Sequence, residues 1–310
     1  MEAKILGIDL ESTIANLHTS APFLSLEITP PLSGKIEVDS IRELKNLDYI
    51  NAFVCTDSPL ARFKPSSILS SLKLQNFLQK PLICTLSMRD RNSIALCGDI
   101  LAANELGVRA FLSLTGDSIK LGDCIESKGV FEDNSLKLAR IIDTLNSGYG
   151  INHKPLSERV QKIYNFHVIN SYANNMESLK TKLAKKLSNS DVEGFFTQPV
   201  YDEKSGEFLL NSLERLNSEY GRKSVLIFGF YPILSYKTAL FLRDKLPGVF
   251  VPESLIKSLE SASKISKQEE EKVGFKQSAI LLQKLQKLNN KIHFMNPNKF
   301  LLFKEYFKGA

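Results

Sequence analysis

The feature that most constrains the fold is a regular alternation of short apolar runs with helical patterns. Each run is rich in Leu, Ile, Val or Phe and stops at a polar residue, Gly or Pro, as buried strands do. The eight runs are residues 23–28, 52–56, 81–86, 110–117, 167–172, 193–198, 224–229 and 291–295. The helical patterns lie at residues 39–47, 66–78, 93–106, 134–145, 177–187, 208–220, 236–246, 253–262 and 267–288.

This alternation predicts a parallel sheet, because helices stand between consecutive strands. Eight strands in 310 residues favour an α/β fold, a closed (β/α)8 TIM barrel. We expect one catalytic domain over residues 1–310, with residues 1–22 as an N-terminal extension or helix. A doubly wound sheet is the alternative. It is less favoured because no G-x-G-x-x-G follows any strand and no P-loop occurs.

The chain is mildly basic, with 40 Lys and Arg against 34 Asp and Glu, a net charge of +6. The excess is scattered in short groups such as residues 180–182 and 185–186, so we expect no nucleic-acid partner. Acidic residues within the first ten positions exclude a signal peptide, and no apolar run approaches the roughly 20 residues of a membrane helix. We therefore expect a cytoplasmic protein with no membrane contact.

The four cysteines give no sign of a metal site. Cys55, Cys84, Cys97 and Cys124 have no C-x-x-C spacing, and no His stands at metal-ligand spacing. They are typical of reduced cysteines in a cytosolic protein. We expect no bound metal, and without a Ser-His-Asp pattern hydrolysis is poorly supported.

Polar residues stand at the carboxyl ends of most predicted strands, where barrel enzymes carry their active sites. They are Glu27, Thr56, the segment 89–92, Asp117, Tyr172 and Gln198, with Met295 after the last strand. Each has a simple structural alternative, such as a helix cap for Asp117 or a surface acid for Glu27. Two isolated carboxylates from different strands suggest an acid and a charge-bearing group in separate roles. The residues alone indicate a barrel enzyme with acid–base or cofactor chemistry on a small ligand.

Seven short motifs stand in order along the chain. They are LEITPP at 26–31, VCTDSP at 54–59, MRDRN at 88–92, LTGD at 114–117, FTQPVYD at 196–202, VPES at 251–254 and IHFM at 292–295. Together they resemble the methylenetetrahydrofolate reductase family over residues 23–303, and the ordered set is quite specific. The resemblance implies a (β/α)8 barrel that holds FAD and reduces 5,10-methylenetetrahydrofolate to 5-methyltetrahydrofolate, which supplies methyl groups for methionine synthesis.

The resemblance also implies roles on the substrate side. NADH or NADPH would reduce the flavin and leave, and the reduced folate would take its place. Glu27 would be the general acid that protonates a folate nitrogen, which requires desolvation to raise its pKa towards neutrality. Asp117 would act near the flavin and pterin rings in catalysis and binding, and the Gln198 amide would contact the pterin. Lys299 would meet the glutamate tail of the folate.

On the cofactor side, the resemblance implies contacts to FAD from six residues. They are Thr56, Arg89, Gly116, Asp117, Tyr172 and Lys186, of which Lys186 would suit a pyrophosphate. As an alternative for the neighbouring charges, Asp90 and Arg91 could simply pair with each other. Gly116 would let the backbone approach the cofactor closely.

The sequence departs from the family pattern at four places. Thr115 stands where some members carry an arginine, which puts one phosphate contact in doubt. Tyr172 is followed by Ala-Asn-Asn rather than the commoner turn with Pro. Met295 and Lys299 stand where some members have Tyr and Arg, and a lysine lacks the bidentate fork of an arginine.

Two other functions remain open from the sequence. The same barrel could be a reductase subunit that takes electrons from an iron–sulfur partner. It could also be a flavin- or folate-binding protein without turnover, although the presence of both Glu27 and Asp117 speaks against that. We expect small-molecule partners, a reduced folate and a nicotinamide dinucleotide, and allow for a homo-oligomer. No segment distinguishes NADH from NADPH.

Overall fold

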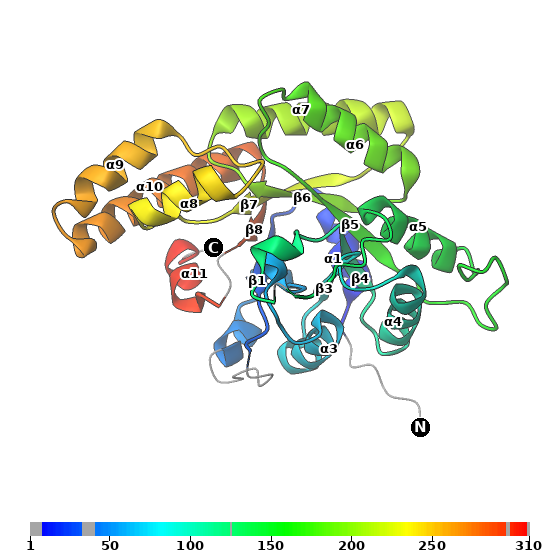
Figure 1. Cartoon of the computed structure of the whole chain (residues 1–310). Helices are drawn as coiled ribbons and strands as arrows, with labels where there is room; N and C mark the ends of the chain where they lie inside the picture. Colours follow the sequence, from blue (N-terminus) through cyan, green and yellow to red (C-terminus); the bar gives the residue numbers. More distant parts are fainter. Residues whose placement is uncertain (1–7, 33–40, 125, 296–297, 309–310) are drawn as a thin grey trace.

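The barrel expected from the sequence is present in the computed structural model of the chain, which describes residues 8–32, 41–124, 126–295 and 298–308 (Figure 1). Eight parallel strands pair in chain order, and β8 pairs with β1 to close the barrel. The strands are β1 Phe23–Ile28, β2 Ala52–Cys55, β3 Leu82–Ser87, β4 Ala110–Leu114, β5 Tyr164–Ile169, β6 Gly194–Pro199, β7 Val225–Phe230 and β8 Lys291–Phe294. The (β/α)8 fold class is confirmed.

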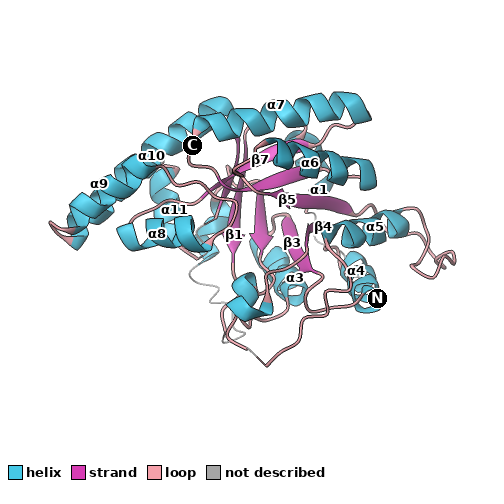
Figure 2. Cartoon of the chain, turned by 45° about the horizontal axis from the view of Figure 1, so that its top comes forward, coloured by secondary structure: helices cyan, strands magenta, loops and turns pink. Residues whose placement is uncertain are grey.

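Helices surround the strands on the outside of the barrel (Figure 2). They are α1 Leu10–Leu17, α3 Ser67–Leu78, α4 Ser93–Glu105, α5 Ser135–Asn146, α6 Glu177–Asn189, α7 Glu203–Tyr220, α8 Tyr236–Lys245, α9 Glu253–Ser263, α10 Lys267–Leu288 and α11 Phe300–Tyr306. Three short 3-10 helices are η1 Glu43–Asn46, η2 Pro59–Ala61 and η3 Ile119–Leu121. Helices α8, α9 and α10 stand together on one side of the barrel (Figure 1). Within the described ranges, no helix has the length and apolar character to cross a membrane.

Some element boundaries differ from the sequence prediction. Strand β5 begins at Tyr164 rather than at residue 167, because its outward residues Asn165 and His167 are polar and yet fully buried. Helix α7 begins at Glu203 rather than at 208, with the Asp202 carboxylate accepting from the Ser205 N–H at 2.9 Å. Such capping starts a helix before its apolar periodicity becomes visible.

Two further segments depart from the prediction near the chain's loops. Helix α11 was not predicted. Of the helix expected at 39–47, residues 39 and 40 lie outside the described residues, and the described part contains the 3-10 helix η1. Both segments are short, and short helices carry little periodicity.

The barrel interior is closed at its amino end by helix α1. Its buried residues Leu10, Ile14 and Leu17 pack with inward-facing side chains from the first half of the strands, such as Phe23 and Ala110. The Asp9 carboxylate accepts from the Ser12 N–H at 2.8 Å and so caps this helix. With its amino end filled in this way, the barrel is open for a ligand only at its carboxyl end.

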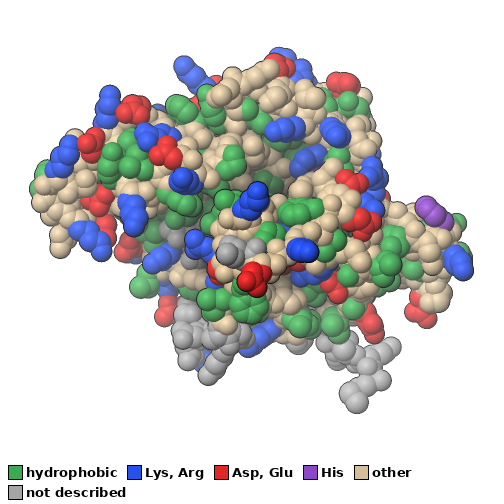
Figure 3. Space-filling model, viewed as in Figure 1, with side chains coloured by type: hydrophobic (Ala, Val, Ile, Leu, Met, Phe, Trp, Pro, Cys, Tyr) green, Lys and Arg blue, Asp and Glu red, His purple; other side chains and the backbone are tan. Residues whose placement is uncertain are grey.

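Basic side chains are dispersed over the face of the molecule that Figure 3 shows. On the face shown in Figure 3, Lys and Arg side chains alternate with acidic ones over several helices instead of forming one patch. On this face the distribution agrees with the scattered lysines of the sequence.

Candidate active site at the carboxyl end of the barrel

A cavity of about 270 Å³ lies at the carboxyl end of the barrel. Side chains or backbone from seven of the eight strands or the loops after them line it. Six residues singled out from the sequence are among them: Glu27, Thr56, Arg89, Gly116, Asp117 and Gln198. A larger hollow of about 400 Å³ lies between α7, α9 and α10, but none of the predicted site residues lines it. The barrel cavity is therefore the candidate active site.

Glu27 lies beside a histidine that barrel closure brings to it. Alternation along β1 and β8 points Ser25, Glu27 and His293 into the barrel, and Ser25 and His293 are partners in the β1–β8 register. The Ser25 hydroxyl and His293 Nδ1 are 2.9 Å apart, and His293 Nε2 lies 3.9 Å from Glu27 Oε2. The ring of Phe196 packs edge-on against the imidazole at 5.1 Å. A largely buried row of hydroxyl, imidazole and carboxylate thus borders the cavity.

Asp117 follows β4 and faces the loop after β2. Its Oδ2 accepts a hydrogen bond from the Leu60 N–H at 2.7 Å. The residue before it, Gly116, has a φ of 96°, and a Cβ there would lie 2.6 Å from Arg89 Cβ. Glycine is therefore required at 116 both for its backbone conformation and for its contact with Arg89.

Thr115, which departs from the arginine of some family members, has a structural role. Its Oγ1 accepts from the Ser135 N–H at 3.1 Å, at the start of α5. This contact satisfies one of the backbone donors that a helix leaves free at its N-terminus. The side chain that occupies the arginine position thus joins the β4 loop to the following helix.

The two arginines of the charged loop after β3 form separate sets of ion pairs. Arg89, which is 2% exposed, donates to both oxygens of Asp90 at 2.8 and 2.6 Å. Arg91 instead pairs with Asp57 at 3.0 Å and with Asp99 at 3.3 Å. The alternative of an Asp90–Arg91 pair is therefore wrong: Asp90 pairs with Arg89, because the buried guanidinium needs a carboxylate partner.

Gln198 reaches the cavity at an irregular point of the sheet. The β6–β7 register shifts between Phe196 and Pro199, and the Gly229 N–H donates to Thr197 Oγ1 at 2.8 Å instead of continuing a regular ladder. Such irregularities re-aim side chains next to functional sites. Gln198 lines the cavity together with Asp117 and Glu27.

Three predicted site residues do not line the barrel cavity. Tyr172 packs against Phe250 with ring centroids 5.1 Å apart. Lys186 donates from Nζ to the Val168 carbonyl at 2.7 Å, and burial lowers its pKa to about 8. Lys299 borders a separate hollow of about 540 Å³ beside α11.

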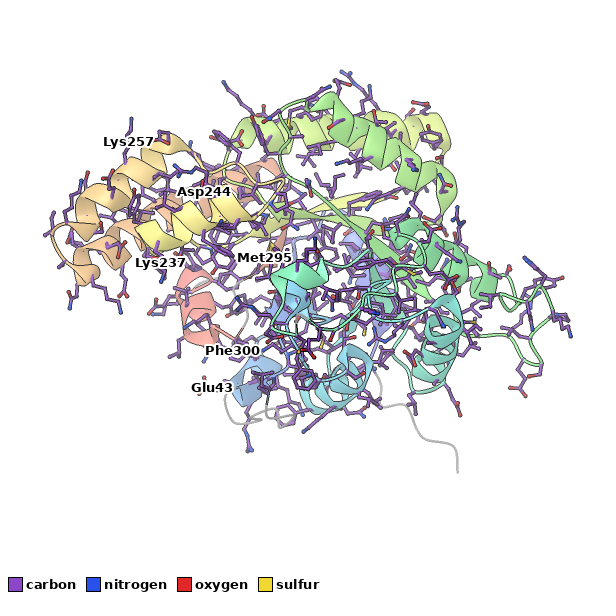
Figure 4. The ribbon with its side chains drawn as sticks, viewed as in Figure 1. Glu43, Lys237, Asp244, Lys257, Met295 and Phe300 are labelled. Carbon is purple, nitrogen blue, oxygen red and sulfur yellow. The ribbon has the colours of Figure 1, made fainter. Side chains whose placement is uncertain are left out.

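Figure 4 shows residues that border the hollow beside α11. Met295 lies near the centre of the view, whereas Phe300 and Glu43 lie further out, beside α11 and η1. Met295 lines the barrel cavity, and Phe300 and Glu43 border the hollow that Lys299 also borders. The two spaces therefore belong to the same side of the barrel but have different linings.

Several cavity residues were not identified from the sequence. Asp57 is buried and accepts from both the N–H and the hydroxyl of Ser87 at 3.1 Å, in addition to pairing with Arg91. His293 was part of a quoted motif but was not assigned a role. Its signal was available, since a histidine inside the apolar β8 run has no packing reason to be there. Asp57 lies two residues after the end of β2. It is also a polar residue at a strand end, but it was not among the predicted site residues.

Comparison with known proteins assigns the chain that carries this site to a family. A family model described as methylenetetrahydrofolate reductase matches residues 12–307. The chain belongs to the methylenetetrahydrofolate reductase family. The match spans every strand of the barrel, so the family covers the scaffold and the cavity together. A comparison with curated proteins gives no match.

Solved structures resemble this family member in fold. One is an uncharacterized protein from Clostridium thermocellum, described as binding two copies of 5-methyl-5,6,7,8-tetrahydrofolic acid. It has a TM-score of 0.60 and 16% identity, and the match covers 96% of each chain. Another is EDTA monooxygenase (EmoA) from Chelativorans sp. BNC1, with a TM-score of 0.55, 11% identity and 92% of each chain covered. At these identities the likeness concerns the barrel fold.

Proposed function

We propose that the chain is a flavin-dependent methylenetetrahydrofolate reductase. It uses NADH or NADPH to reduce 5,10-methylenetetrahydrofolate to 5-methyltetrahydrofolate, in the cytoplasm and for methionine synthesis. The observation that carries the proposal is the meeting of Glu27, Asp117 and Gln198 around one cavity in a chain of this family. The Clostridium thermocellum neighbour, described as binding 5-methyltetrahydrofolate, supports a reduced folate as the substrate class.

The cavity lining fits the ring system of a flavin. Val54, Leu112 and Phe196 contribute apolar surface, and the backbone at Gly116 lines the cavity without a side chain in the way. Thr56 adds a hydroxyl, which also donates to Thr29 Oγ1 at 2.9 Å. Apolar walls with a few placed polar groups are typical of cofactor sites. When bound, FAD would supply the hydride carrier that the side chains lack.

Six residues would hold this cofactor under the proposal. Thr56, Arg89, Gly116 and Asp117 belong to the cavity lining, and Tyr172 and Lys186 lie outside it. Arg89 is bonded to Asp90 and to the Ser58 carbonyl at 3.1 Å, so its part is to fix the cavity wall with its charge nearby. The half-buried ammonium of Lys186 uses one of its three N–H donors on the Val168 carbonyl, which leaves two for a phosphate.

Glu27 would donate the proton to the folate nitrogen. Its side chain is 17% exposed and faces His293. When the Ser25 hydroxyl donates to His293 Nδ1, Nε2 carries a proton and faces the Glu27 carboxylate. The imidazole N–H can then orient the carboxylate once the two groups approach within hydrogen-bond distance. Solvent replaces the proton that Glu27 gives up in each turnover, because a neutral imidazole that lost its Nε2 proton would become an anion.

Asp117 and Gln198 would position the pterin ring. A pterin presents several N–H donors, which a carboxylate accepts, and the Gln198 amide supplies one donor and one acceptor. Both side chains line the cavity, Asp117 from the loop after β4 and Gln198 from β6. Lys299 would attract the glutamate tail from its place beside α11.

The visible spectrum of the purified protein tests this proposal. We expect a yellow flavoprotein, or one that takes up added FAD, whose absorbance is bleached by NADH or NADPH under anaerobic conditions. Subsequent addition of 5,10-methylenetetrahydrofolate should restore the oxidised spectrum. A colourless preparation that binds no added FAD would contradict the proposal.

A folate-binding protein without turnover is the second candidate. The folate-binding description of the Clostridium thermocellum neighbour favours it. The same spectroscopic experiment separates the two candidates. A non-catalytic binder takes up 5-methyltetrahydrofolate, but neither NADH nor NADPH changes any flavin absorbance. A third outcome, flavin reduction only by an iron–sulfur protein, would identify a reductase subunit.

A further inference from the structure

The loop after β2, residues 58–63, has an unfavourable backbone. Ser58, Leu60 and Ala61 have φ values of 44°, 55° and 54°, in the left-handed region. Residues with a Cβ adopt this region at a cost, and the loop contains no glycine to relieve it. Contacts with other parts of the chain must therefore hold the loop in place.

Those contacts come from two other loops at the mouth of the barrel. The Leu60 N–H donates to Asp117 Oδ2 at 2.7 Å, and the Phe63 N–H donates to Asp123 Oδ1 at 2.9 Å. Arg89 holds the Ser58 carbonyl. Gly122 packs so closely that a Cβ on it would lie 2.1 Å from the Ala61 carbonyl oxygen.

The same loop limits the size of the candidate active site. Pro59 lines the cavity, whose volume is about 270 Å³. Ligand sites usually measure about 300–1,000 Å³. The proposed reaction needs a flavin ring and a second ring side by side in this space, so the cavity must enlarge. The strained segment that borders it is the part best suited to move.

We infer that residues 58–63 form a lid over the barrel cavity, and that Asp117 is its latch. In the closed state the Asp117 carboxylate accepts from the lid at Leu60; in the open state the same carboxylate is free for the N–H groups of a ring ligand. This inference rests on the proposed function for the identity of the ligand, but not for the movement itself. The strain in the closed backbone keeps the closed and open states close in free energy.

Gly122→Ala is the variant that should open the lid. Gly122 has a φ of −86°, which alanine adopts freely, so the only penalty is the contact of the new methyl group with Ala61. Gly98→Ala is the matched control, because a Cβ at Gly98, in α4, meets nothing within 4 Å. Both variants leave the proposed catalytic residues intact.

Ala61→Gly should have the opposite effect. Glycine accepts a φ of 54° without strain, so the closed lid is favoured. His153→Gly is its control: His153 has a φ of 61° and is exposed in the loop between α5 and β5, at the opposite end of the barrel. It relieves the same kind of strain without touching the lid.

Two readouts test the lid. The first is hydrogen exchange of the 58–63 segment in the ligand-free protein, which we expect to be about fivefold faster in Gly122→Ala and about fivefold slower in Ala61→Gly than in the parent. The second is the stopped-flow association rate of FAD with apoprotein, which should change in the same directions. The Gly98→Ala and His153→Gly controls should leave both rates unchanged.

The outcomes separate the lid from the proposed function. Unchanged exchange in both lid variants would overturn the lid, whatever FAD does. Changed exchange together with an unchanged FAD association rate would also overturn it, because the segment would then move without controlling access. If the parent binds no FAD at all, the proposed function fails, and the exchange rates alone decide whether the segment opens.

Discussion

The two ends of the barrel use their charged residues differently. At the amino end charges are paired with each other: Arg109 with Glu11 at 2.6 Å, and Asp191 with both Lys162 and Arg222 at 3.3 Å. These groups border strand starts, and helix α1 fills the space between them with apolar side chains. Such an end contributes to stability and leaves no room for a ligand.

At the carboxyl end Asp57 and Asp90 are also paired with arginines, but two other acids face a cavity without a cationic partner in an ion pair of ordinary length. Glu27 has a histidine 3.9 Å away, too far for a hydrogen bond, and Asp117 is bonded to the backbone of a strained loop. Polar groups that are incompletely paired inside a protein cost stability unless a ligand satisfies them. The difference indicates that the amino end of this barrel serves stability, whereas the carboxyl end carries the candidate site, which is where barrel enzymes have theirs.

Among these variants, Leu17→Ala at the amino end should give the largest loss of stability. It tests whether that end serves stability alone. Leu17 is fully buried in α1, and its truncation should lower the free energy of unfolding by about 2–5 kcal/mol. Turnover per folded molecule should stay unchanged. Urea unfolding and the proposed reductase assay measure the two effects.

Asp117→Asn is the matched change at the other end. It should lower turnover while leaving the urea midpoint close to that of the parent, since the amide oxygen still accepts from Leu60. If Asp117→Asn destabilises as much as Leu17→Ala, or if Leu17→Ala lowers turnover per folded molecule, the two ends are not separate.

His167→Phe should change the acid stability of the barrel wall. His167 is fully buried, and burial lowers its pKa to about 3. Between pH 3 and 6.5 the unfolded chain therefore binds more protons, so stability falls as pH falls below 6.5. At pH 5 this costs about 2 kcal/mol relative to pH 7.

The phenylalanine variant should lose this part of the pH dependence. Phe195, which stacks with His167 at 6.2 Å, offers an aromatic neighbour for the new ring. Urea unfolding of parent and variant at pH 5 and pH 7 provides the comparison. Equal losses of stability in the two proteins would show that His167 takes no part in acid sensitivity.

Lys186→Met should change the free energy of unfolding by less than the variants above. It also tests whether Lys186 belongs to the cofactor site. Burial lowers the pKa of Lys186 from 10.5 to about 8, so the parent protein gains stability as the pH rises from 8 to 10.5. Below pH 8 the folded protein carries the ammonium form, which burial makes unfavourable. Methionine should raise the free energy of unfolding at pH 7 by about 1 kcal/mol, after allowance for the lost bond to Val168.

The same variant tests the pyrophosphate role implied by the family resemblance. If Lys186 binds a phosphate, FAD affinity should fall about tenfold in Lys186→Met. Equilibrium titration with FAD, alongside the unfolding curves, measures it. An unchanged affinity would make Lys186 a structural lysine of α6 and remove it from the cofactor site.

The fold was accessible from the sequence because barrel strands are buried on both faces and read as apolar runs. The start of strand β5 was predicted too late because Asn165 is polar and interrupts the apolar run. Its amide oxygen accepts a hydrogen bond from the Ser113 hydroxyl of the neighbouring strand at 2.7 Å. No local pattern announces such a pair. Helix α11 was missed because its seven residues are too few for periodicity.

The site was accessible only where a residue stands at a strand end. Glu27, Asp117 and Gln198 were found that way, and the structure gathers them at one cavity. His293 was not assigned because its partners Ser25 and Glu27 lie more than 260 residues away in the chain and meet it only through the β1–β8 closure. The strained backbone of residues 58–63 has no signature either, since nothing in Ser-Pro-Leu-Ala marks a left-handed turn.

The reaction of reduced Glu27→Gln protein with 5,10-methylenetetrahydrofolate tests the central claim most directly. Stopped-flow mixing follows the return of flavin absorbance, with Glu260→Gln on the exposed face of α9 as the control. We predict that reduction by NADH or NADPH is retained, while reoxidation by the folate slows by about 10²–10⁴-fold, the usual contribution of a positioned acid. Reoxidation at the parent rate would contradict the assignment of Glu27 as the acid of this site.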